Sequence, residues 1–330
     1  MKKKINIIIF GEGRQAKFYK KILCKKKYIN LINNKNKKYT FKESIKEKID
    51  LAIVANATPY HFKSLNFLLS KDVNILCEKP FCSNYEQAYK IYKNSKKYKK
   101  LFYLNYQFRF ESHIQFIKKL IISKKLGKIK SVKIDWITNQ KKADDRLYSF
   151  KNSFKSGGVI KEFASHVIDY CRWIFDNDLF VKNSFGKNNI KYLKNIDGVL
   201  KKCSGFDYSE VFLKNDLDIN FFIKINNFGK KSYHNIYLEG DNSFCSIVHN
   251  YPFRDTDIKI IYKFKNNKKI FYKHFTSCQN SRILSTNKIL NKIILAILKN
   301  TNNNLIANFK DGLYVHKIIK NIYNKNRKSV

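Results

Sequence analysis

A glycine-containing turn follows the first apolar run of the chain, INIIIF at residues 5–10. The turn consists of Gly11, Glu12, Gly13, Arg14, Gln15 and Ala16. In a dinucleotide-binding turn the first glycine permits the tight bend, the second lets backbone N–H groups approach the pyrophosphate, and the third position must be small. Ala16 meets the last requirement, and a helix starting near Gly13 would direct its N-terminal dipole at the phosphates. The pattern predicts a dinucleotide site; an ordinary glycine turn is the alternative.

The same fingerprint predicts an acidic residue about 20 positions further on, which would hold the ribose hydroxyls. The count from Gly13 reaches Asn33, which the run NKNKK follows, and no carboxylate occurs there. Asn33 with Lys35, Lys37 and Lys38 could receive a 2′-phosphate, which favours NADP(H). Because lysines occur near every position of this chain, NAD(H) and NADP(H) both stay open, with a slight preference for the phosphorylated cofactor.

A carboxylate and an imidazole lie four positions apart in the segment 156–175, SGGVIKEFASHVIDYCRWIF. If the part after Gly157 and Gly158 is a helix, Glu162 and His166 lie on one face and project together. Histidine can take up and return a hydroxyl proton near neutral pH, and a neighbouring carboxylate can bind a substrate hydroxyl or bias its ionisation. On the residues alone, a histidine that only packs in the core is the alternative.

Short apolar runs alternate with helical patterns in the first third of the chain. The runs lie at 5–10, 29–32, 51–57, 73–76 and 101–106, and helical spacing occupies 60–70 and 83–97. Unbroken apolar runs are typical of strands buried on both faces, so the alternation predicts a parallel sheet wrapped by helices. The stretch between Asn33 and Asp50 is short for a crossover, and one helix of the nucleotide-binding half is expected to be missing or reduced.

The pattern changes near residue 129. Longer runs with partial alternation occur at 129–138, 217–226, 234–240, 244–248 and 257–264, and an amphipathic helix is predicted at 313–323. These runs predict a second domain with a more open sheet. We therefore expect a nucleotide-binding domain over residues 1–122 and a substrate-binding and oligomerisation domain over 123–330, with a closing helix that can pack back on the first domain.

Composition narrows the classes of partner. The formal net charge is +42, but only seven of the 67 basic residues are arginine, and lysine is spread along the whole chain. A nucleic-acid reader more often concentrates arginine in one stripe, so we expect no specific nucleic-acid partner; weak, salt-sensitive binding is the alternative. Seven scattered cysteines without a CxxC pair and the lack of a bilayer-length apolar run indicate a cytoplasmic protein without a membrane partner.

Four segments together resemble a known family. They are VANATPYHF (54–62), NILCEKPF (74–81), NYQFRF (105–110) and the segment 156–175. Their order and spacing are similar to those of the glucose-fructose oxidoreductase and inositol dehydrogenase family, Gfo/Idh/MocA, over essentially the whole chain. The resemblance implies a Rossmann-type parallel sheet domain and a C-terminal α/β domain with a large open, mostly antiparallel sheet. It also implies an NAD(P)-dependent dehydrogenase acting on a secondary alcohol or ketone of a sugar or polyol, which could be nucleotide-activated.

The resemblance assigns the central role to Lys79. In such enzymes the lysine of Glu-Lys-Pro reaches the substrate hydroxyl beside the nicotinamide, and the following proline tends to be cis. The chain has only three prolines, Pro59, Pro80 and Pro252, and a cis bond before Pro80 would fix the direction of Lys79. An ammonium held there would stabilise the alkoxide-like oxygen that develops as hydride leaves. A solvated surface lysine is the alternative.

The resemblance also implies roles for residues of the later segments. His166 would move the hydroxyl proton and Glu162 would position the substrate. At the place of Glu162, four residues before the histidine, the family usually carries the shorter aspartate. Tyr106 and Arg109 would contact substrate or only brace the domain junction. Arg146 would at most face an anionic group of the substrate.

The remaining expectations concern the cofactor, partners and assembly. The expected cofactor-binding residues are Gly11, Gly13, Arg14, Gln15, Ala16, Asn33, Thr58, Pro59, His61, Glu78 and Lys79. Of these, Thr58 and Pro59 would shape the backbone under the nicotinamide, and His61 could equally be a capping or packing residue. We expect no metal ion, and we expect the protein to form a homo-dimer or homo-tetramer. A non-catalytic sensor that binds a dinucleotide or sugar is the alternative function.

Overall fold

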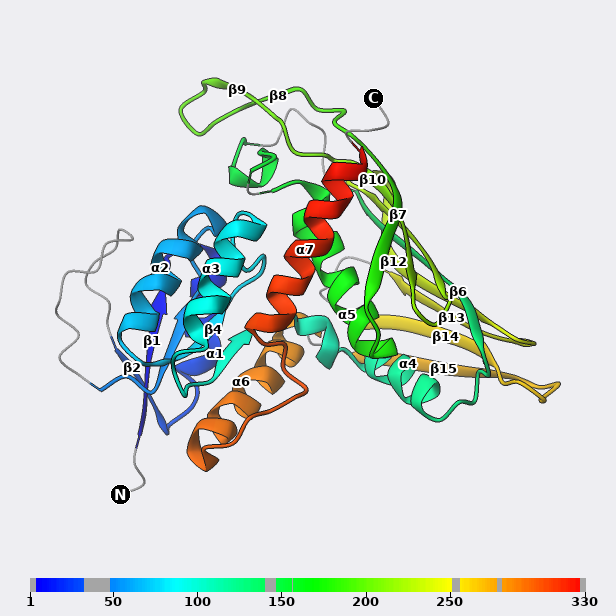
Figure 1. The fold of residues 1–330 in the computed structure, drawn as a ribbon, viewed down its shortest axis with the longest axis horizontal. Helices are drawn as coiled ribbons and strands as arrows, with labels where there is room; N and C mark the ends of the chain where they lie inside the picture. The colour runs from blue at the N-terminus through cyan, green and yellow to red at the C-terminus, as the bar shows by residue number, and fades with distance from the viewer. Residues whose placement is uncertain are drawn as a thin grey trace. The chain divides into compact units, whose positions relative to one another are not determined.

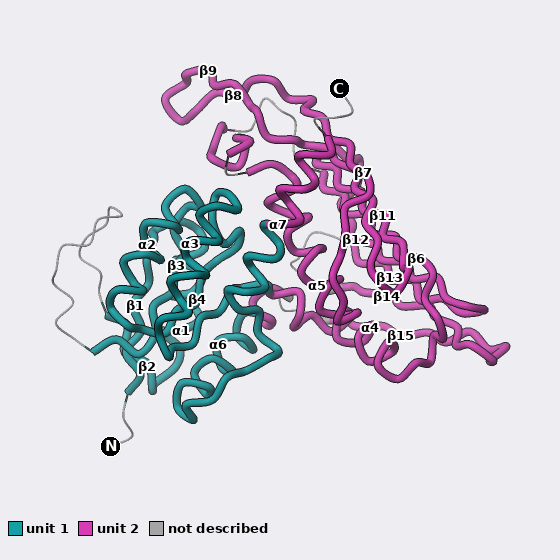
Figure 2. Tube along the Cα trace, viewed as in Figure 1, with its two compact units in different colours: residues 1–106, 286–316 teal, residues 107–285, 317–330 magenta. Residues whose placement is uncertain are grey.

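The structure is a computed structural model that describes residues 4–32, 48–139, 147–155, 157–250, 256–277 and 281–326. The chain forms two compact units, shown in separate colours in Figure 2. Unit 1 contains residues 1–106 and 286–316, and unit 2 contains residues 107–285 and 317–330. The boundary that we expect near residue 122 stays a prediction.

Unit 1 is built on a five-stranded parallel sheet with the order β2-β1-β3-β4-β5 (Figure 1). Its strands are β1 (Ile5–Phe10), β2 (Ile29–Ile32), β3 (Leu51–Val54), β4 (Asn74–Cys77) and β5 (Phe102–Leu104). Every residue of β3 is buried, because a parallel sheet covered on both faces leaves no strand face to water. The predicted Rossmann-type sheet is confirmed.

Helices connect the strands of this sheet. They are α1 (Arg14–Leu23), α2 (Thr58–Ser70) and α3 (Tyr85–Ser95), joined in unit 1 by most of α6 (Ser281–Lys299) and the first part of α7 (Phe309–Asn326). The chain leaves β1 into α1 and returns to β2 on one side of β1, whereas β3 lies on the other side. This reversal of direction beside β1 is where open α/β sheets bind ligands, at the carboxyl ends of the strands.

Unit 2 is built on an eight-stranded sheet with the order β15-β14-β13-β12-β6-β11-β10-β7. The strands are β6 (Ile129–Asn139), β7 (Leu179–Lys187), β10 (Tyr208–Asn215), β11 (Asn220–Asn226), β12 (Phe228–Gly240), β13 (Ser243–Asn250), β14 (Thr256–Lys263) and β15 (Ile270–Ser277). All neighbours in the sheet are antiparallel except β6 and β11. The expected large, mostly antiparallel sheet is therefore confirmed; a short hairpin, β8 (Tyr192–Lys194) and β9 (Leu200–Lys202), accompanies it.

Helices and short helical turns accompany this sheet, besides the start of α6 and the end of α7. They are η1 (Gln107–Phe110), α4 (Ser112–Ile122), η3 (Phe150–Asn152) and α5 (Ser165–Phe175), with a π-helical turn, η4 (Ile160–Ala164), directly before α5. Phe116 of α4 contacts Tyr262 of β14, and Phe175 of α5 contacts Phe221 of β11, with ring centroids 5.3 and 5.4 Å apart. The helices thus pack on one face of the sheet and leave a core of alternate strand residues between them.

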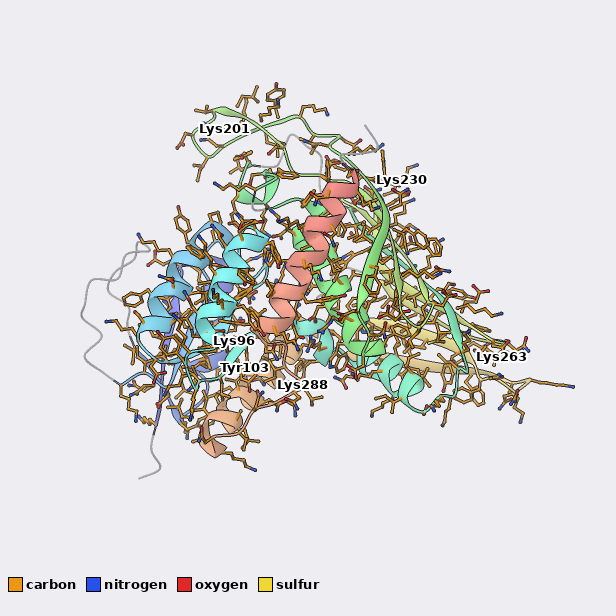
Figure 3. The ribbon with its side chains drawn as sticks, in the orientation of Figure 1. Lys96, Tyr103, Lys201, Lys230, Lys263 and Lys288 are labelled. Atoms are coloured by element: carbon orange, nitrogen blue, oxygen red, sulfur yellow. The ribbon has the colours of Figure 1, made fainter. Side chains whose placement is uncertain are left out.

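The lysines that give the chain its charge are spread over separate elements. Figure 3 labels lysines that come from the end of α3, from β9, β12 and β14, and from α6, and no single helix or strand collects them; they are Lys96, Lys201, Lys230, Lys263 and Lys288. This distribution favours a general compositional bias over a dedicated polyanion-binding stripe. Among the described residues, no helix is both long enough and apolar enough to cross a bilayer.

Candidate functional site

The turn after β1 has the backbone geometry of a close approach. Gly11 has φ +119°, and a Cβ built on it would lie 2.6 Å from the carbonyl oxygen of Ala55. Glycine is therefore required there, because every other residue would be strained and would collide with the backbone after β3. Gly13 is different: its φ is −68° and a Cβ on it would meet nothing within 4 Å. The space in front of Gly13 is open to a ligand.

The N-terminus of α1 fits a dinucleotide phosphate. Gly13 is its N-cap and supplies no side-chain cap, and the first turn carries no acidic residue. The first backbone N–H groups thus keep their donor capacity and the positive end of the helix dipole is not neutralised locally. Ala16 is fully buried, as the fingerprint requires, and Arg14 is exposed at the start of the helix. These features support a nicotinamide dinucleotide at this turn.

Glu78 lies directly after β4 and accepts hydrogen bonds from two residues of α1 and from one residue that follows β5. Its Oε1 accepts hydrogen bonds from Gln15 Nε2 (2.7 Å), Tyr19 Oη (2.7 Å) and Asn105 Nδ2 (2.8 Å). Asn105 Nδ2 also donates to Tyr19 Oη at 2.7 Å. Glu78 is only 7% exposed, and the three hydrogen bonds that its Oε1 accepts come from neutral donors, as a buried polar group requires. Glu78 and Gln15, both expected at the cofactor, bind each other in this structure.

The Lys79–Pro80 turn, which follows Glu78, is held by the side chain of His61. The Lys79–Pro80 peptide bond is cis, as the resemblance implies. The His61 ring is buried; its Nδ1 lies 2.9 Å from the Pro80 carbonyl oxygen and its Nε2 lies 3.0 Å from that of Asn56. Burial lowers the pKa of His61, so the neutral ring donates to one of the two carbonyls. His61 therefore braces the Lys79 turn.

A second histidine and two thiols complete this brace. The Cys82 backbone N–H donates to Nε2 of His316 on α7 at 3.1 Å. The Cys77 thiol donates to the Glu78 carbonyl oxygen at 3.2 Å. Burial raises the pKa of both Cys77 and Cys82, so both are protonated, small core residues at neutral pH. Lys79 itself is half-buried, between the anchored Glu78 and the braced backbone after it.

The other residues expected in this unit are placed as follows. Thr58 begins α2 and is buried, and Pro59 occupies the first turn and is exposed. Tyr106 is 1% exposed, which makes it a core residue of unit 1. Asn33 and the lysines after it lie outside the described residues, and so does Arg146 of the second unit.

In unit 2 the segment with Glu162 and His166 enters through two glycines. A Cβ on Gly157 would lie 2.1 Å from the Lys151 carbonyl oxygen, and Gly158 has φ +76°. The expectation of one regular helix needs correction, because residues 160–164 form a π-helical turn and the α-helix begins at Ser165. A π-turn widens the helix locally and is frequent at functional sites. Glu162 therefore lies in the π-helical turn, whereas His166 lies in the α-helix after it.

Both charged residues of the π-turn have partners. Glu162 Oε2 accepts an ion-paired hydrogen bond of 2.7 Å from Lys151 Nζ. Its neighbour Lys161 is 5% exposed, and its Nζ donates to the carbonyl oxygens of Phe154 (2.9 Å) and Lys155 (2.6 Å). Burial lowers the pKa of Lys161 to about 8. This segment is therefore held by its own charged side chains.

The helix that carries His166 is fixed by a buried ion pair. Arg109 donates through Nε to Asp169 Oδ2 at 2.9 Å and through Nη2 to Oδ1 at 2.6 Å. Asp169 lies three positions after His166, so the pair orients the same helical turn. His166 is 5% exposed, and its ring centroid lies 5.0 Å from that of Phe108. Arg109 and Asp169 both lie in unit 2, so the pair fixes η1 to α5 within that unit, and the expected role of Arg109 at the substrate or the domain junction stays a prediction.

Several contacts of the site had only weak signals in the sequence. Asn105 and Tyr19 both donate to Glu78, yet only Asn105 lies in one of the four segments that resemble the family. Lys161 is one lysine among many, and its burial has no sequence signal. His316 lies in the closing helix, where helical spacing would place it on the apolar face, and this is the one signal that could have found it.

Two family models match the chain. Residues 7–106 match a model described as an oxidoreductase family with an NAD-binding Rossmann fold, and residues 118–199 match the C-terminal alpha/beta domain of the same family. A glucose-6-phosphate 3-dehydrogenase of Bacillus subtilis is 28% identical over 185 residues, which cover 54% of this chain and 52% of that protein. The chain thus spans about half the length of the curated relative that it matches.

Solved structures share the fold over nearly the full length. Levoglucosan dehydrogenase in complex with NADH and L-sorbose superposes with a TM-score of 0.82 at 16% identity, over 99% of this chain and 97% of that one. A super-repressor mutant of Gal80p from Saccharomyces cerevisiae superposes with a TM-score of 0.84 at 14% identity, over 99% and 97%. At these identities the likeness shows the fold alone. The two matched models together cover more than half of the residues, and the chain belongs to the Gfo/Idh/MocA family of NAD-binding oxidoreductases.

Proposed function

We propose that the protein is an NAD(P)-dependent dehydrogenase that interconverts a secondary alcohol and a ketone of a sugar or sugar-like polyol. The observation that carries the proposal is the fixed turn at Lys79. Hydrogen bonds from Gln15, Tyr19 and Asn105 hold the residue before it, and His61 holds the backbone after it. A lysine whose backbone is fixed on both sides can present its ammonium in one direction, which is what stabilising a developing alkoxide requires.

A bound nicotinamide would accept or return the hydride. The chain's own residues would do the rest: the N–H groups at the start of α1 would hold the pyrophosphate, and Lys79 would polarise the substrate oxygen. His166 would take the hydroxyl proton during oxidation and return it during reduction. Glu162 would bind a neighbouring substrate hydroxyl, after its carboxylate exchanges the Lys151 ammonium for that donor.

The sugar class of the substrate rests on the relatives. The curated relative carries glucose 6-phosphate in its name, and one solved neighbour was crystallised with L-sorbose. We infer the same chemical class for this chain, together with a preference between NAD(H) and NADP(H) that Asn33 and its lysines would set. We also infer a homo-oligomer, because aromatic side chains stand exposed on the sheet of unit 2, as Phe185 (50%), Phe222 (47%) and Tyr272 (74%) do.

The test is a turnover assay with a matched variant. Purified protein would be incubated with NAD⁺ or NADP⁺ and a panel containing glucose 6-phosphate, levoglucosan, inositol and nucleotide sugars, and reduced nicotinamide would be followed by absorbance. We expect turnover of at least one phosphorylated or free sugar, and a loss of about 10²–10⁴-fold in kcat for His166→Asn. Replacement of the exposed His274 by Asn provides the control. Turnover that survives in His166→Asn would contradict the proton-transfer role.

A non-catalytic sensor is the second candidate, and one observation favours it. The Glu162 carboxylate is already paired with Lys151, which reduces its capacity to act on a substrate hydroxyl. A sensor would bind NADH or a sugar without any turnover across the whole panel. Its ligand response, measured as a shift in melting temperature, would also survive Lys79→Ala, whereas a dehydrogenase would lose turnover in that variant.

A further inference from the structure

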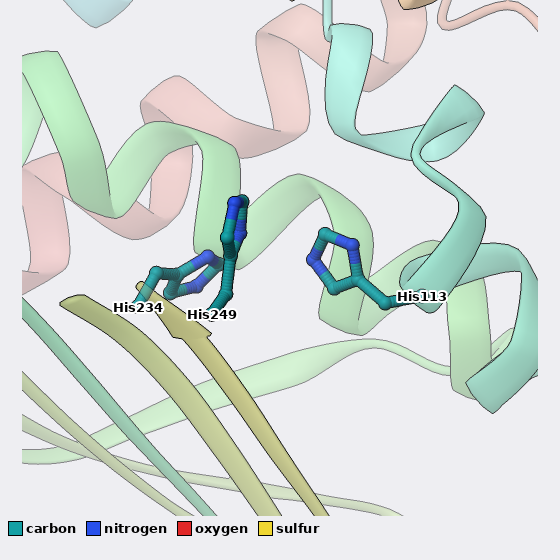
Figure 4. A group of neighbouring side chains, drawn as sticks. All are labelled: His113, His234 and His249. Atoms are coloured by element: carbon teal, nitrogen blue, oxygen red, sulfur yellow. The ribbon is translucent and has the colours of Figure 1, made fainter. Parts of the chain in front are cut away.

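Three histidines from three elements meet in the interior of unit 2. His113 lies in the first turn of α4, His234 on β12 and His249 on β13. His234 and His249 are direct cross-strand partners in the antiparallel register, so their side chains share one face of the sheet. Figure 4 shows the ring of His113 reaching toward these two from the helix. The exposed fractions are 0%, 0% and 1%, respectively.

The spacing of these rings is close to that of a metal site. One ligand nitrogen from each histidine lies within 4.8 Å of the others. Zinc–nitrogen bonds of about 2.0–2.1 Å in a tetrahedron place the ligand nitrogens about 3.4 Å apart. Small side-chain rotations that bring the nitrogens together by about 1 Å would therefore close the site. His113 sits on a helix and the other two on paired strands, so the backbone already brings the ligands together.

The protonation state of the cluster suits a cation. The three rings are almost completely buried, and burial disfavours the charged, protonated form of an imidazole. A neutral imidazole carries one nitrogen lone pair that can bind a metal ion. Protonated rings would repel a metal ion; neutral imidazoles are its usual ligands.

Polar atoms in the cluster lack the partners that burial normally demands. Within the described residues, both ring nitrogens of His113 and Nδ1 of His234 have no hydrogen-bond partner. A buried polar atom without a partner calls for a specific explanation, of which an ion or a trapped water is the usual one. The His234 ring is held in place, because Tyr170 Oη lies 3.1 Å from its Nε2 and Trp136 stacks on it at 4.5 Å. Such outer contacts orient ligands in metal sites.

We propose that His113, His234 and His249 bind one divalent transition metal ion, with zinc as the first candidate and a water molecule as the fourth ligand. Three imidazoles are a donor set that zinc accepts in tetrahedral sites. The ion would tie α4 to the β12–β13 pair and so stabilise unit 2. The proposal does not depend on the dehydrogenase function, because it needs neither nucleotide nor Lys79.

The experiment uses the full-length protein after removal of metal with a chelator. Cobalt(II) would be titrated as a spectroscopic substitute for zinc, and zinc would then be used to displace it. We expect the visible d–d bands of tetrahedral cobalt at a stoichiometry of one ion per chain. Zinc at about 100 times its Kd would raise the melting temperature by about 5–10 °C.

Two variants separate a metal site from a buried cluster without metal. His113→Leu removes one ligand in a nearly apolar site, and we expect metal affinity to fall by at least about 100-fold. His274→Leu on the exposed β15 is the matched control and would bind as the parent protein does. If His113→Leu does not fold, the cobalt spectrum and stoichiometry of the parent protein decide. A parent protein without stoichiometric tetrahedral cobalt, or undiminished binding in a folded His113→Leu variant, would overturn the proposal.

Discussion

Each unit of the molecule carries an adjacent pair of lysine and glutamate, and the two pairs are built in opposite ways. In unit 1 the glutamate is buried and anchored: Glu78 is 7% exposed and accepts from three neutral donors, whereas Lys79 is half-buried. In unit 2 the lysine is buried and anchored: Lys161 is 5% exposed and donates to two backbone carbonyls, whereas Glu162 is half-buried.

The contrast shows how a charged side chain can be aimed by its neighbour. In both pairs the first residue, Glu78 or Lys161, is buried and fixes the local backbone by its hydrogen bonds. The direction of the residue that follows it, Lys79 or Glu162, is thereby defined. Unit 1 presents a cation, which suits a developing alkoxide; unit 2 presents an anion, which suits a substrate hydroxyl. The two pairs also differ in their partners: Glu78 accepts from three neutral side chains, whereas Lys161 donates to two backbone carbonyls and burial lowers its pKa.

The largest effect on kcat is expected for a substitution of Lys79 in unit 1. Lys79→Ala should lower kcat by about 10²–10³-fold, because it removes the group that would stabilise the substrate oxygen. Steady-state kinetics on the substrate found in the panel would measure it, with the exposed Lys63→Ala as the matched control. Equal kcat values for the two variants would show that the anchored turn does not serve catalysis.

The anchored lysine of unit 2 should appear in the pH dependence of stability. Its pKa is about 8 in the folded state and 10.5 in an exposed lysine, so between these values the unfolded state binds more protons. The free energy of unfolding should therefore rise with pH across this window, by about 3 kcal/mol in total, relative to Lys161→Met. Urea unfolding of both proteins between pH 7.5 and 10.5 would measure the difference, and parallel pH profiles would contradict it.

The anchored glutamate of unit 1 should matter for stability as well as for activity. Glu78→Gln weakens the acceptor of three hydrogen bonds and should lower the free energy of unfolding by about 1–3 kcal/mol. Because the anchor positions Lys79, kcat should fall while KM changes little. The exposed Glu86→Gln is the control, measured by the same denaturant unfolding. A stable Glu78→Gln variant with full activity would break the proposed link between anchor and presented lysine.

The smallest effect is expected for the presented glutamate of unit 2. Lys151 is 47% exposed in its ion pair with Glu162, so the pair is screened by solvent, and Lys151→Ala should cost at most about 1 kcal/mol of stability. Freeing the carboxylate should instead lower KM for the sugar. A raised KM in Lys151→Ala would indicate that the ion pair itself forms part of the substrate site.

The fold could be predicted because its signals are local. The apolar runs that became β1, β3 and β4 carry their burial in their own residues, and the alternation from residue 129 onward marks the open sheet. The glycine turn after β1 could be predicted equally well, since the tight bend at Gly11 has a positive φ that requires glycine. β7, β10 and β15 were not predicted, because lysine and other polar residues interrupt their apolar positions in the sequence.

The site could be predicted only as a set of residue types. The donors to Glu78 lie 63, 59 and 27 positions away in the chain, so no local spacing relates them. The burial of Lys161 was hidden by the abundance of lysine, and the three clustered histidines come from a helix and two later strands. The π-helical turn before His166 was also missed. Over so few residues, a π-helical turn and a regular α-helix have the same pattern of apolar and polar residues.

Titration of NADH and NADPH into the parent protein and into Gly13→Val would show whether the turn at Gly13 binds a nicotinamide dinucleotide. The structure leaves open space at the Gly13 Cβ and gives it an ordinary φ of −68°, so the variant should keep its melting temperature. We expect the parent protein to bind at least one of the two cofactors, and Gly13→Val, with its side chain where the pyrophosphate would lie, to bind at least about tenfold more weakly. A parent protein that binds neither, or a variant that binds equally well, would contradict this expectation.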